Sequence, residues 1–393
     1  MDFLKKIFRR KREEKPERKL KVAWISSYFP RSCGIAYYSE DYIQALKKIK
    51  KNLEVSIISH SDALEATYPI ISLTDRSWHG KVVEAVKYIN PDIIHIQHEY
   101  GLYETFQDKN QRLLTLLKEL KDSKFPTVMT YHSLYSQLTP AQAQFVSKSL
   151  RLLNVGIFHC QYQLDDLPTN IDWEPENVEI IPHGSDEKIE LDREECKNRF
   201  GYEGKNVVGM MGLASGRKGF DRVIKRWPEI SRKVENAILV LEVKPQPTEE
   251  SINYISQISY LVAKNEQKGS IELIIRDYTR EEFLEKLRSF DILVLPYLSE
   301  SQSGVLAHSF AAGTPAVVRD IEGLGYEIKR SGAGIAARDD EEICQGIIKL
   351  MNDPEERAKM EEKAHSYVKD YCGWSKVAKR TLSLYNQILK TNP

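Results

Sequence analysis

The sequence predicts an α/β protein made of two doubly wound domains that face a central cleft. Short apolar runs alternate with amphipathic stretches along almost the whole chain, which is the pattern of parallel sheets covered by helices on both faces. The same pattern starts again near residue 206. The length of 393 residues also suits two domains, at about 100–200 residues each.

The first half carries apolar runs that we expect to be buried strands, separated by amphipathic segments that we expect to be helices. The expected strands are 21–29, 54–60, 92–99, 126–132, 153–160 and 178–184, and the expected helices are 37–50, 78–89 and 108–120. Such an order predicts a Rossmann-like domain over residues 20–190.

The second half repeats this order over residues 191–374. The expected strands are 206–212, 236–243, 271–277, 291–297 and 314–320, and the expected helices are 221–234, 248–266, 280–290, 340–351 and 354–371, with a last helix near 375–391. Ligands of such sheets bind beyond the carboxyl ends of the strands, so the cleft between the domains is the expected site.

Composition excludes several classes of function. The 57 basic residues are balanced by 57 acidic residues, so overall charge does not favour a nucleic-acid partner. The five cysteines have no CxxC spacing, which indicates neither a zinc site nor a disulfide framework and favours a reducing, cytoplasmic location. No run reaches the roughly 20 apolar residues of a membrane-spanning helix, and no signal peptide is expected.

The first 19 residues are strongly basic. Phe3, Leu4, Ile7 and Phe8 fall on one face of a helix, and lysines and arginines surround them. This pattern is typical of a helix lying on an anionic membrane surface, and equally of a disordered charged tail. Peripheral contact with the inner face of the cell membrane is therefore one of two open interpretations.

Three strand-to-helix loops have the residues that a phosphate group requires, namely glycines and the exposed amides of a helix start. They contain Gly34, then Gly212 with Arg217 and Lys218, and then Ser303-Gly304. Neither GxxxxGK[ST] nor GxGxxG occurs at these loops, which disfavours a P-loop or an ordinary nicotinamide site. A carboxylate beside the third loop, Glu300, suits sugar hydroxyls rather than phosphate.

Several stretches resemble the motifs of one enzyme family, the retaining nucleotide-sugar glycosyltransferases of family 4, which have the GT-B fold. The stretches are "PRSCGIAYYSEDYIQAL" (30–46), "PDIIHIQHEYGLY" (91–103), "TYHSLYS" (130–136), "IIPHGSD" (180–186), "VVGMMGLASGRKGFDR" (207–222) and "FDILVLPYLSESQSGVLAHSFAAGTPAVV" (290–318). The resemblance covers residues from about 20 to 391. It implies that the last helix, 375–391, crosses back to the N-terminal domain.

The resemblance also implies roles for individual residues. Lys218 would bind the donor diphosphate, Glu300 the hydroxyls of the donor sugar, and His132 the donor sugar and phosphate; these three are the candidate catalytic residues. The expected donor-binding residues are Gly34, Gly212, Arg217, Lys218, Arg276, Glu300, Ser303, Gly304, Val305 and His308.

The sequence departs from the family pattern at two places. His308 stands where the family has a second glutamate, on the nucleotide ribose, and Leu213 stands where it has an arginine. We expect the imidazole to hydrogen-bond a ribose hydroxyl, and Arg217 to replace the missing arginine. The stretch from Arg276 to Tyr278 is the expected base pocket.

His98, Tyr100 and Tyr103 are the residues expected on the acceptor side, with the tyrosines offering rings on which a sugar can stack. His95 and His98 lie on one predicted strand, and we expect them to share a face or a loop edge. With Glu99 they could imitate a metal cluster, but no third ligand follows at a suitable spacing, so no metal is expected.

The expected function is transfer of a sugar from a nucleotide-diphosphate sugar to a saccharide or lipid-linked acceptor, in envelope polysaccharide or glycolipid synthesis. The transfer would retain configuration and need no metal or other cofactor, since no DxD-type pair occurs at a strand end. The changes at 213 and 308 leave open a catalytically degenerate scaffold or partner subunit. A GT-B-fold epimerase is a third reading, which the stretch 299–315 fits less well.

Overall fold

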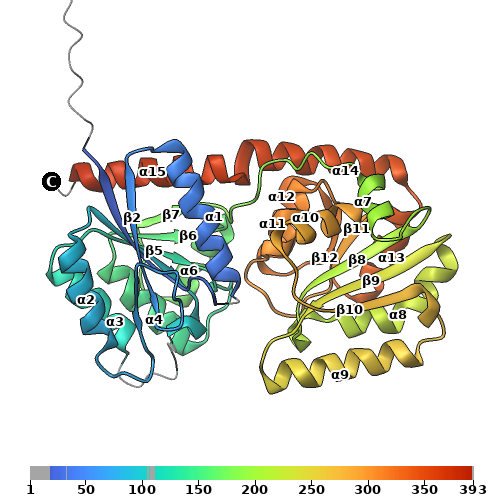
Figure 1. Cartoon of the computed structure of the whole chain (residues 1–393), viewed down its shortest axis with the longest axis horizontal. Helices are drawn as coiled ribbons and strands as arrows, with labels where there is room; N and C mark the ends of the chain where they lie inside the picture. The colour runs from blue at the N-terminus through green and yellow to red at the C-terminus, as the bar shows by residue number, and fades with distance from the viewer. Residues whose placement is uncertain (1–17, 32, 104–105, 107–110, 392–393) are drawn as a thin grey trace, which may run out of the picture.

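The computed structural model describes residues 18–391, apart from 32, 104–105 and 107–110. Two α/β domains lie side by side, and each is built on one parallel sheet with helices packed on its faces (Figure 1). This is the predicted GT-B architecture, so the predicted fold class is confirmed. The basic segment 1–19 falls outside the described residues except for Arg18 and Lys19.

The N-terminal sheet has seven strands in the order β3-β2-β1-β4-β5-β6-β7, and all of its pairings are parallel. The order reverses between β1 and β4, where Trp24 pairs with His95, while on the other side Trp24 pairs with Ile57 of β2. The strands are β1 Leu20–Ile25, β2 Leu53–His60, β3 Tyr68–Ile71, β4 Ile93–His98, β5 Thr127–Tyr131, β6 Val155–Phe158 and β7 Val178–Ile180.

Helices cover both faces of this sheet, and each face has a separate apolar core. The helices are α1 Gly34–Ile49, α2 Trp78–Ile89, η1 Tyr100–Tyr103 (3₁₀), α3 Arg112–Asp122, α4 Pro140–Leu152, α5 Gln161–Asp165 and α6 Leu167–Asn170. The local sequence sets some of these boundaries. For example, Thr139 and Gln142 form a reciprocal capping box before Pro140, which starts α4.

The C-terminal sheet has six parallel strands in the order β10-β9-β8-β11-β12-β13. Its order reverses between β8 and β11, the counterparts of β1 and β4. The strands are β8 Asn206–Leu213, β9 Ala237–Lys244, β10 Ile271–Ile275, β11 Ile292–Leu295, β12 Ala316–Arg319 and β13 Gly334–Ala337.

The helices of the second half complete this domain and lead back to the first. They are α7 Arg193–Arg199, η2 Gly216–Lys218 (3₁₀), α8 Phe220–Lys233, α9 Glu249–Lys264, η3 Lys268–Ser270 (3₁₀), α10 Arg280–Ser289, α11 Gly304–Ala311, α12 Glu322–Ser331, α13 Asp340–Met351, α14 Pro354–Tyr367, a π-helical turn Val368–Cys372 and α15 Trp374–Thr391. Among the described residues, none of the helices combines the length and the apolar character that a bilayer crossing requires.

The chain crosses between the domains twice, and the two crossings touch. The first follows β7, and the second runs from α14 into α15 along one edge of the molecule (Figure 1). Ser185 donates its amide to Cys372 and accepts from the amide of Trp374, each at 2.9 Å. A Cβ at Gly184 would lie 2.1 Å from the Trp374 ring, so this close approach requires glycine.

Helix α15 belongs to the core of the N-terminal domain although it follows the C-terminal domain in sequence. Its buried side chains pack with α1 and one face of the N-terminal sheet, and Tyr42 of α1 hydrogen-bonds Thr381. Below them, His95 of β4 uses both ring nitrogens, one 2.6 Å from the Tyr385 hydroxyl and the other 2.8 Å from Thr130 Oγ1. The buried hydrogen bonds therefore fix where α15 lies on the sheet.

Burial lowers the pKa of His95 to about 3, so its ring is neutral in the folded protein. An unfolded histidine titrates near 6.5, so acid favours the unfolded chain. We expect His95 to cost about 2 kcal/mol of stability between pH 7.5 and pH 5. Urea unfolding of the unchanged protein and of His95→Gln is measured at both pH values. The loss of unfolding free energy between pH 7.5 and pH 5 should be about 2 kcal/mol smaller in the variant. An unchanged pH dependence in the variant would contradict a neutral His95.

Candidate active site

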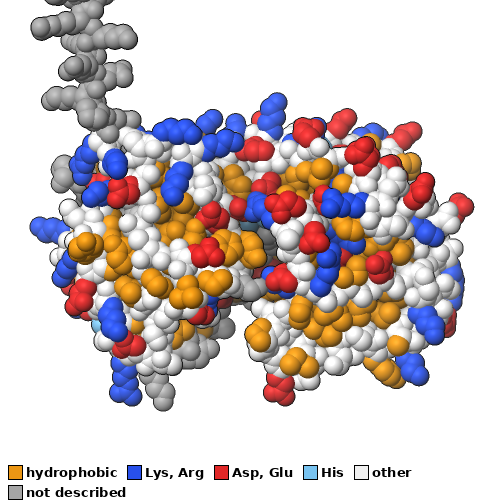
Figure 2. Space-filling view, viewed as in Figure 1, with side chains coloured by type: hydrophobic (Ala, Val, Ile, Leu, Met, Phe, Trp, Pro, Cys, Tyr) orange, Lys and Arg blue, Asp and Glu red, His pale blue; other side chains and the backbone are white. Residues whose placement is uncertain are grey.

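The residues that follow the four switch-point strands meet in one cavity between the domains. The cavity measures about 430 Å³. Gly34 follows β1 and Glu99 follows β4, while Lys218 follows β8 and Glu300 follows β11. Figure 2 shows the surface hollowed between the two halves, with charged side chains gathered beside the hollow. The cavity thus lies where doubly wound sheets bind ligands.

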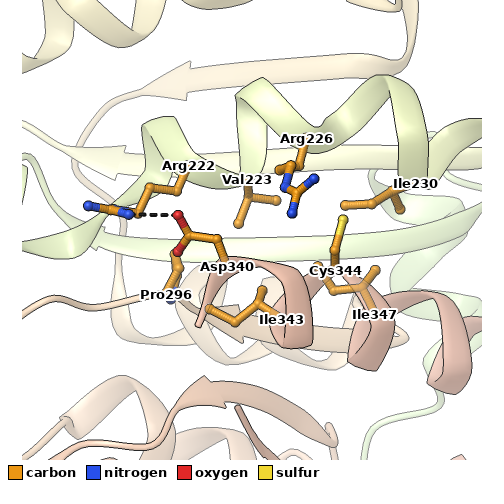
Figure 3. Close-up of a pocket in the computed structure, with 9 residues that line it drawn as sticks. All are labelled: Arg222, Val223, Arg226, Ile230, Pro296, Asp340, Ile343, Cys344 and Ile347. Atoms are coloured by element: carbon orange, nitrogen blue, oxygen red, sulfur yellow. Dashed lines mark hydrogen bonds and ion pairs between the residues drawn. The ribbon is translucent and has the colours of Figure 1, made fainter. Parts of the chain in front are cut away.

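A second pocket lies within the C-terminal domain and has no room for such a ligand. It measures about 10 Å³, which is the size of one water molecule. Helices α8 and α13 form it, with Arg222 paired to Asp340 at 2.6 Å on its edge (Figure 3). The lining residues are Arg222, Val223, Arg226, Ile230, Pro296, Asp340, Ile343, Cys344 and Ile347.

Lys218 and Glu300 form an ion pair on the C-terminal wall of the cavity. The ammonium group also lies 3.9 Å from the centre of the Tyr297 ring, a cation–π contact. Burial alone would lower the pKa of Lys218, but Tyr297 and Glu300 outweigh it and raise the pKa. A buried, fully charged lysine therefore faces the cavity.

The start of α11 lies on the same wall. Ser303 caps the helix, accepting from the amide of Leu306 at 3.3 Å, and α11 begins at Gly304. Ser303, Gly304 and Val305 all line the cavity. The first amides of a helix have no partner within the helix and carry partial positive charge. The predicted turn thus places anion-binding groups on the same wall as Lys218.

The N-terminal wall contains the predicted Gly34 and His132. A Cβ built on Gly34 meets nothing within 4 Å, so open space lies beside the start of α1. His132 Nε2 lies 2.8 Å from the Gln97 side-chain oxygen, and His132 Nδ1 lies 3.5 Å from His159. Burial, followed by the neighbouring His159, lowers the pKa of His132 well below its usual range. His132 is therefore a neutral hydrogen-bonding group at this wall.

His308 belongs to a chain of polar and charged side chains that joins the two domains. Its Nδ1 lies 3.0 Å from Asp186, in the segment that follows β7. Arg280 of α10 contacts Asp186 as well and holds both carboxylate oxygens of Asp41 on α1, at 2.6 and 2.7 Å. Burial alone would raise the pKa of Asp186, but His308 and Arg280 lower it, so Asp186 is ionised. All four residues line the cavity.

A second group of contacts joins the domains. Ser301 Oγ lies 2.7 Å from the carbonyl oxygen and 3.1 Å from the amide of Leu134, after β5. Nearby, Ser136 donates to the Glu322 carboxylate through its amide at 2.9 Å and its hydroxyl at 2.7 Å. Glu322 has a φ of 41°, an unusual conformation for a residue with a side chain. The domains are therefore in direct contact around the cavity.

Some predicted residues do not lie on the cavity wall. Arg217 is exposed beside Lys218, and Arg276 pairs with Glu282 at 3.1 Å instead. His98 and Tyr103 are core residues of the N-terminal domain, with Tyr100 beside them. These three residues, predicted on the acceptor side, are not part of the cavity lining, and their rings pack inward around Phe145 and Trp78.

The expectation that His95 and His98 share a face was wrong. Side chains alternate along a strand, so residues three apart point to opposite faces. His95 packs against Trp24 and Tyr385 under α15, whereas His98 packs against Phe145 under α4. Within the described residues, no three histidine, cysteine, aspartate or glutamate side chains are grouped as metal ligands are.

Several residues that line the cavity were not predicted from the sequence. No sequence pattern marks Asp41, Arg280 or Asp186 as cavity residues, because their contacts join segments far apart in sequence. Tyr278 lies within the stretch expected to form the base pocket, and its ring stacks on Phe283 with centroids 5.5 Å apart. Their position relative to the strands and helices could have indicated them, because most of these residues lie just after a strand or at a helix start.

Comparison with known proteins agrees with this geometry. A family described as glycosyl transferases group 1 matches residues 192–367. The matched region contains Lys218, Glu300 and the start of α11, which lie on the C-terminal wall of the cavity. The predicted resemblance is confirmed at the level of this match.

Individual relatives are distant. An uncharacterized glycosyltransferase of Methanocaldococcus jannaschii is 26% identical over 275 residues, which cover 67% of this chain and 64% of that relative. HepE of Anabaena, solved with UDP-glucose, is 12% identical with a TM-score of 0.72, covering 94% of this chain and all of that one. A sucrose-phosphate synthase from Thermosynechococcus elongatus is 15% identical with a TM-score of 0.73, covering 95% and 100%. At these identities the solved structures show the shared fold.

We expect Arg280→Gln to loosen the contact between the two domains, because Asp41 and Asp186 lose their shared cation. Loss of such charged hydrogen bonds costs about 1–3 kcal/mol. X-ray scattering in solution should show a larger radius of gyration for the variant than for the unchanged protein. Arg226→Gln is the matched control, since Arg226 pairs with Glu341 inside the C-terminal domain. Equal radii for all three proteins would contradict a bridging role for Arg280.

Proposed function

We propose that this protein is a retaining, metal-independent glycosyltransferase of family 4. It moves a sugar from a nucleotide-diphosphate sugar to a saccharide or lipid-linked acceptor. The observation that carries the proposal is the C-terminal wall of the cavity, where a buried charged lysine, a carboxylate and the free amides of a helix start converge. A pyrophosphate linked to a sugar requires both kinds of group, cationic donors for phosphate and an acceptor for hydroxyls.

In this proposal Lys218 and the amides of Ser303, Gly304 and Val305 bind the donor pyrophosphate, and Gly34 leaves space for it from the other wall. Glu300 turns from Lys218 to the hydroxyls of the donor sugar when the phosphate takes its place beside the ammonium. The solved complex of HepE with UDP-glucose supports a nucleotide sugar as the donor class.

The other end of the cavity suits the nucleoside. Asp186 lies beside His308 Nδ1, so the other ring nitrogen remains to bind a ribose hydroxyl. The stacked rings of Tyr278 and Phe283 offer an aromatic wall for the base. Arg276, which was expected here, lies outside the cavity lining, so the rings replace it in the proposal.

The reaction breaks the bond between the sugar C1 and the phosphate oxygen and forms a bond from C1 to the acceptor oxygen on the same face. The acceptor hydroxyl gives its proton to the departing phosphate. Negative charge grows on the diphosphate as the bond breaks, and Lys218 with the α11 amides stabilises it. Contact between the domains excludes water, which strengthens these interactions.

A degenerate scaffold is the second candidate, and two observations favour it. His308 and Leu213 replace residues of the family pattern, and Lys218 is already paired with Glu300. A scaffold of this kind would keep the fold and the domain contacts but would not bind a nucleotide sugar. Donor binding therefore separates the two candidates.

We expect thermal shifts with at least one member of a panel of UDP-, GDP- and ADP-sugars. Lys218→Gln should weaken binding of that donor by about 100-fold, because a buried charged contact to phosphate is lost. Arg217→Gln is the matched control, with an effect below about threefold, since Arg217 is exposed and off the cavity wall. A chain that no nucleotide sugar stabilises would support the scaffold.

We also propose that the basic segment 1–19 holds the enzyme at the cytoplasmic face of the membrane, where a lipid-linked acceptor for envelope polysaccharide or glycolipid synthesis would lie. Its apolar side chains and clustered cations support this. The full chain should sediment with vesicles of phosphatidylglycerol and phosphatidylcholine, and a variant lacking residues 1–18 should remain in the supernatant. Vesicles of phosphatidylcholine alone are the control. Equal sedimentation of both proteins would refute the role of the segment.

A further inference from the structure

Glu99 is a carboxylate on the N-terminal wall of the cavity that the proposed reaction leaves without a role. It follows β4, one of the two strands at the switch point of the N-terminal sheet. Its Oε2 accepts from the amide of Gly101 at 2.7 Å. A Cβ on Gly101 would lie 2.9 Å from that oxygen, so glycine at 101 allows the carboxylate to fold over its own loop. The loop therefore holds Glu99 in one orientation.

Glu99 differs from the other charged residues of the cavity lining in its partners. Arg280 binds Asp41 and Asp186, Lys218 binds Glu300, and Lys244 binds Asp277 at 2.7 Å. In the part of the chain that the structure describes, no cation pairs with Glu99. Its Oε1 lies 3.5 Å from the hydroxyl of Ser133, which is long for a hydrogen bond between oxygens. This oxygen can therefore accept a further hydroxyl.

The place of Glu99 matches the second substrate rather than the donor. The groups for pyrophosphate and sugar lie on the C-terminal wall, whereas Glu99 and Ser133 lie on the N-terminal wall. Glu99 and Glu300 nevertheless line the same cavity, so the carboxylate of Glu99 shares it with the group proposed for the donor sugar.

We propose that Glu99 and Ser133 bind the glycosyl acceptor through its hydroxyl groups, and that the acceptor is an uncharged saccharide at this end. A fixed carboxylate accepts strong hydrogen bonds from hydroxyls. It repels a phosphate or carboxylate on the acceptor, because like charges at short range in a partly buried site cost several kcal/mol. The inference rests on the proposed transfer reaction and names the class of its second substrate.

The test uses the full-length protein and whichever nucleotide sugar stabilises it. Transfer rates are measured with a panel of neutral alkyl glycosides and with the matching sugar phosphates. The protein should transfer sugar to neutral glycosides in preference to the sugar phosphates. Glu99→Gln should raise the KM for the neutral glycoside by about 10- to 100-fold, as loss of a charged hydrogen bond implies. The Kd for the donor should stay within about twofold.

Glu99→Gln is suited to this test because its amide oxygen can still accept from Gly101, so the loop keeps its hydrogen bond. Glu84→Gln is the matched control: Glu84 is an exposed carboxylate on α2, away from the cavity lining. Glu99→Gln should also narrow the preference for neutral glycosides over sugar phosphates, which a merely structural role would not do. The control should leave both quantities unchanged.

Three results would overturn the inference while leaving donor binding intact. They are an unchanged KM in Glu99→Gln, transfer to sugar phosphates in preference to neutral glycosides, and no transfer to any neutral glycoside. Failure of the unchanged protein to bind any nucleotide sugar would instead refute the proposed function on which the inference rests. The donor measurement thus distinguishes the two failures.

Discussion

The packing of α15 on the N-terminal domain is the constraint on which the site depends. The cavity exists because the carboxyl edges of two separate sheets face each other, and nothing within either sheet sets that geometry. Trp374 lies against Gly184, and Ser185 bonds Cys372 and Trp374, so the two chain crossings form one joint. Tyr385 and Thr381 then anchor the returning helix to His95 and Tyr42. A helix from the end of the chain thereby orients both walls.

The two walls have different electrostatic characters. Lys218 and the first amides of α11 make the C-terminal wall suited to anions, and Tyr297 together with Glu300 raises the pKa of the lysine and keeps it charged. The N-terminal wall has neutral His132 and the carboxylate of Glu99, and burial rather than a nearby ion sets the state of the histidine. A substrate that carries a diphosphate would therefore bind at the C-terminal wall, and a substrate that is recognised through its hydroxyl groups would bind at the N-terminal wall.

The expected strands were correct where they are buried on both faces, since such strands consist of nearly continuous apolar residues. The strands β1, β4, β5, β8, β9 and β11 fall within the ranges expected for them, apart from terminal residues. The strands β3 and β13 were missed, because each is a four-residue edge strand and most of its residues are only partly buried. The helix α12, from Glu322 to Ser331, was also missed, and its first residue has an unusual backbone conformation.

His98 and Glu99 are neighbours at the end of β4, and for both of them the observed position differs from the expected one. His98 was expected on the acceptor side and lies in the core, while Glu99, which was considered only as part of a cluster resembling a metal site, lines the cavity. The sequence shows that both follow an apolar run, but the side of the sheet on which each lies depends on the register of β4 with β1 and β5. A shift of one residue exchanges the two faces, so the pairing had to be known.

By itself, the sequence determined the two-domain α/β class, the apolar strands, and the glycine- and serine-bearing loops at their ends, because burial and turn geometry act over a few residues. Only the tertiary structure decided that Asp41, Arg280, Asp186 and His308 join in one charged chain, and that Arg217 stays outside the cavity. The longest of these contacts joins Asp41 and Arg280, which are 239 residues apart in the chain. Local sequence carries no record of them, because packing between domains creates them.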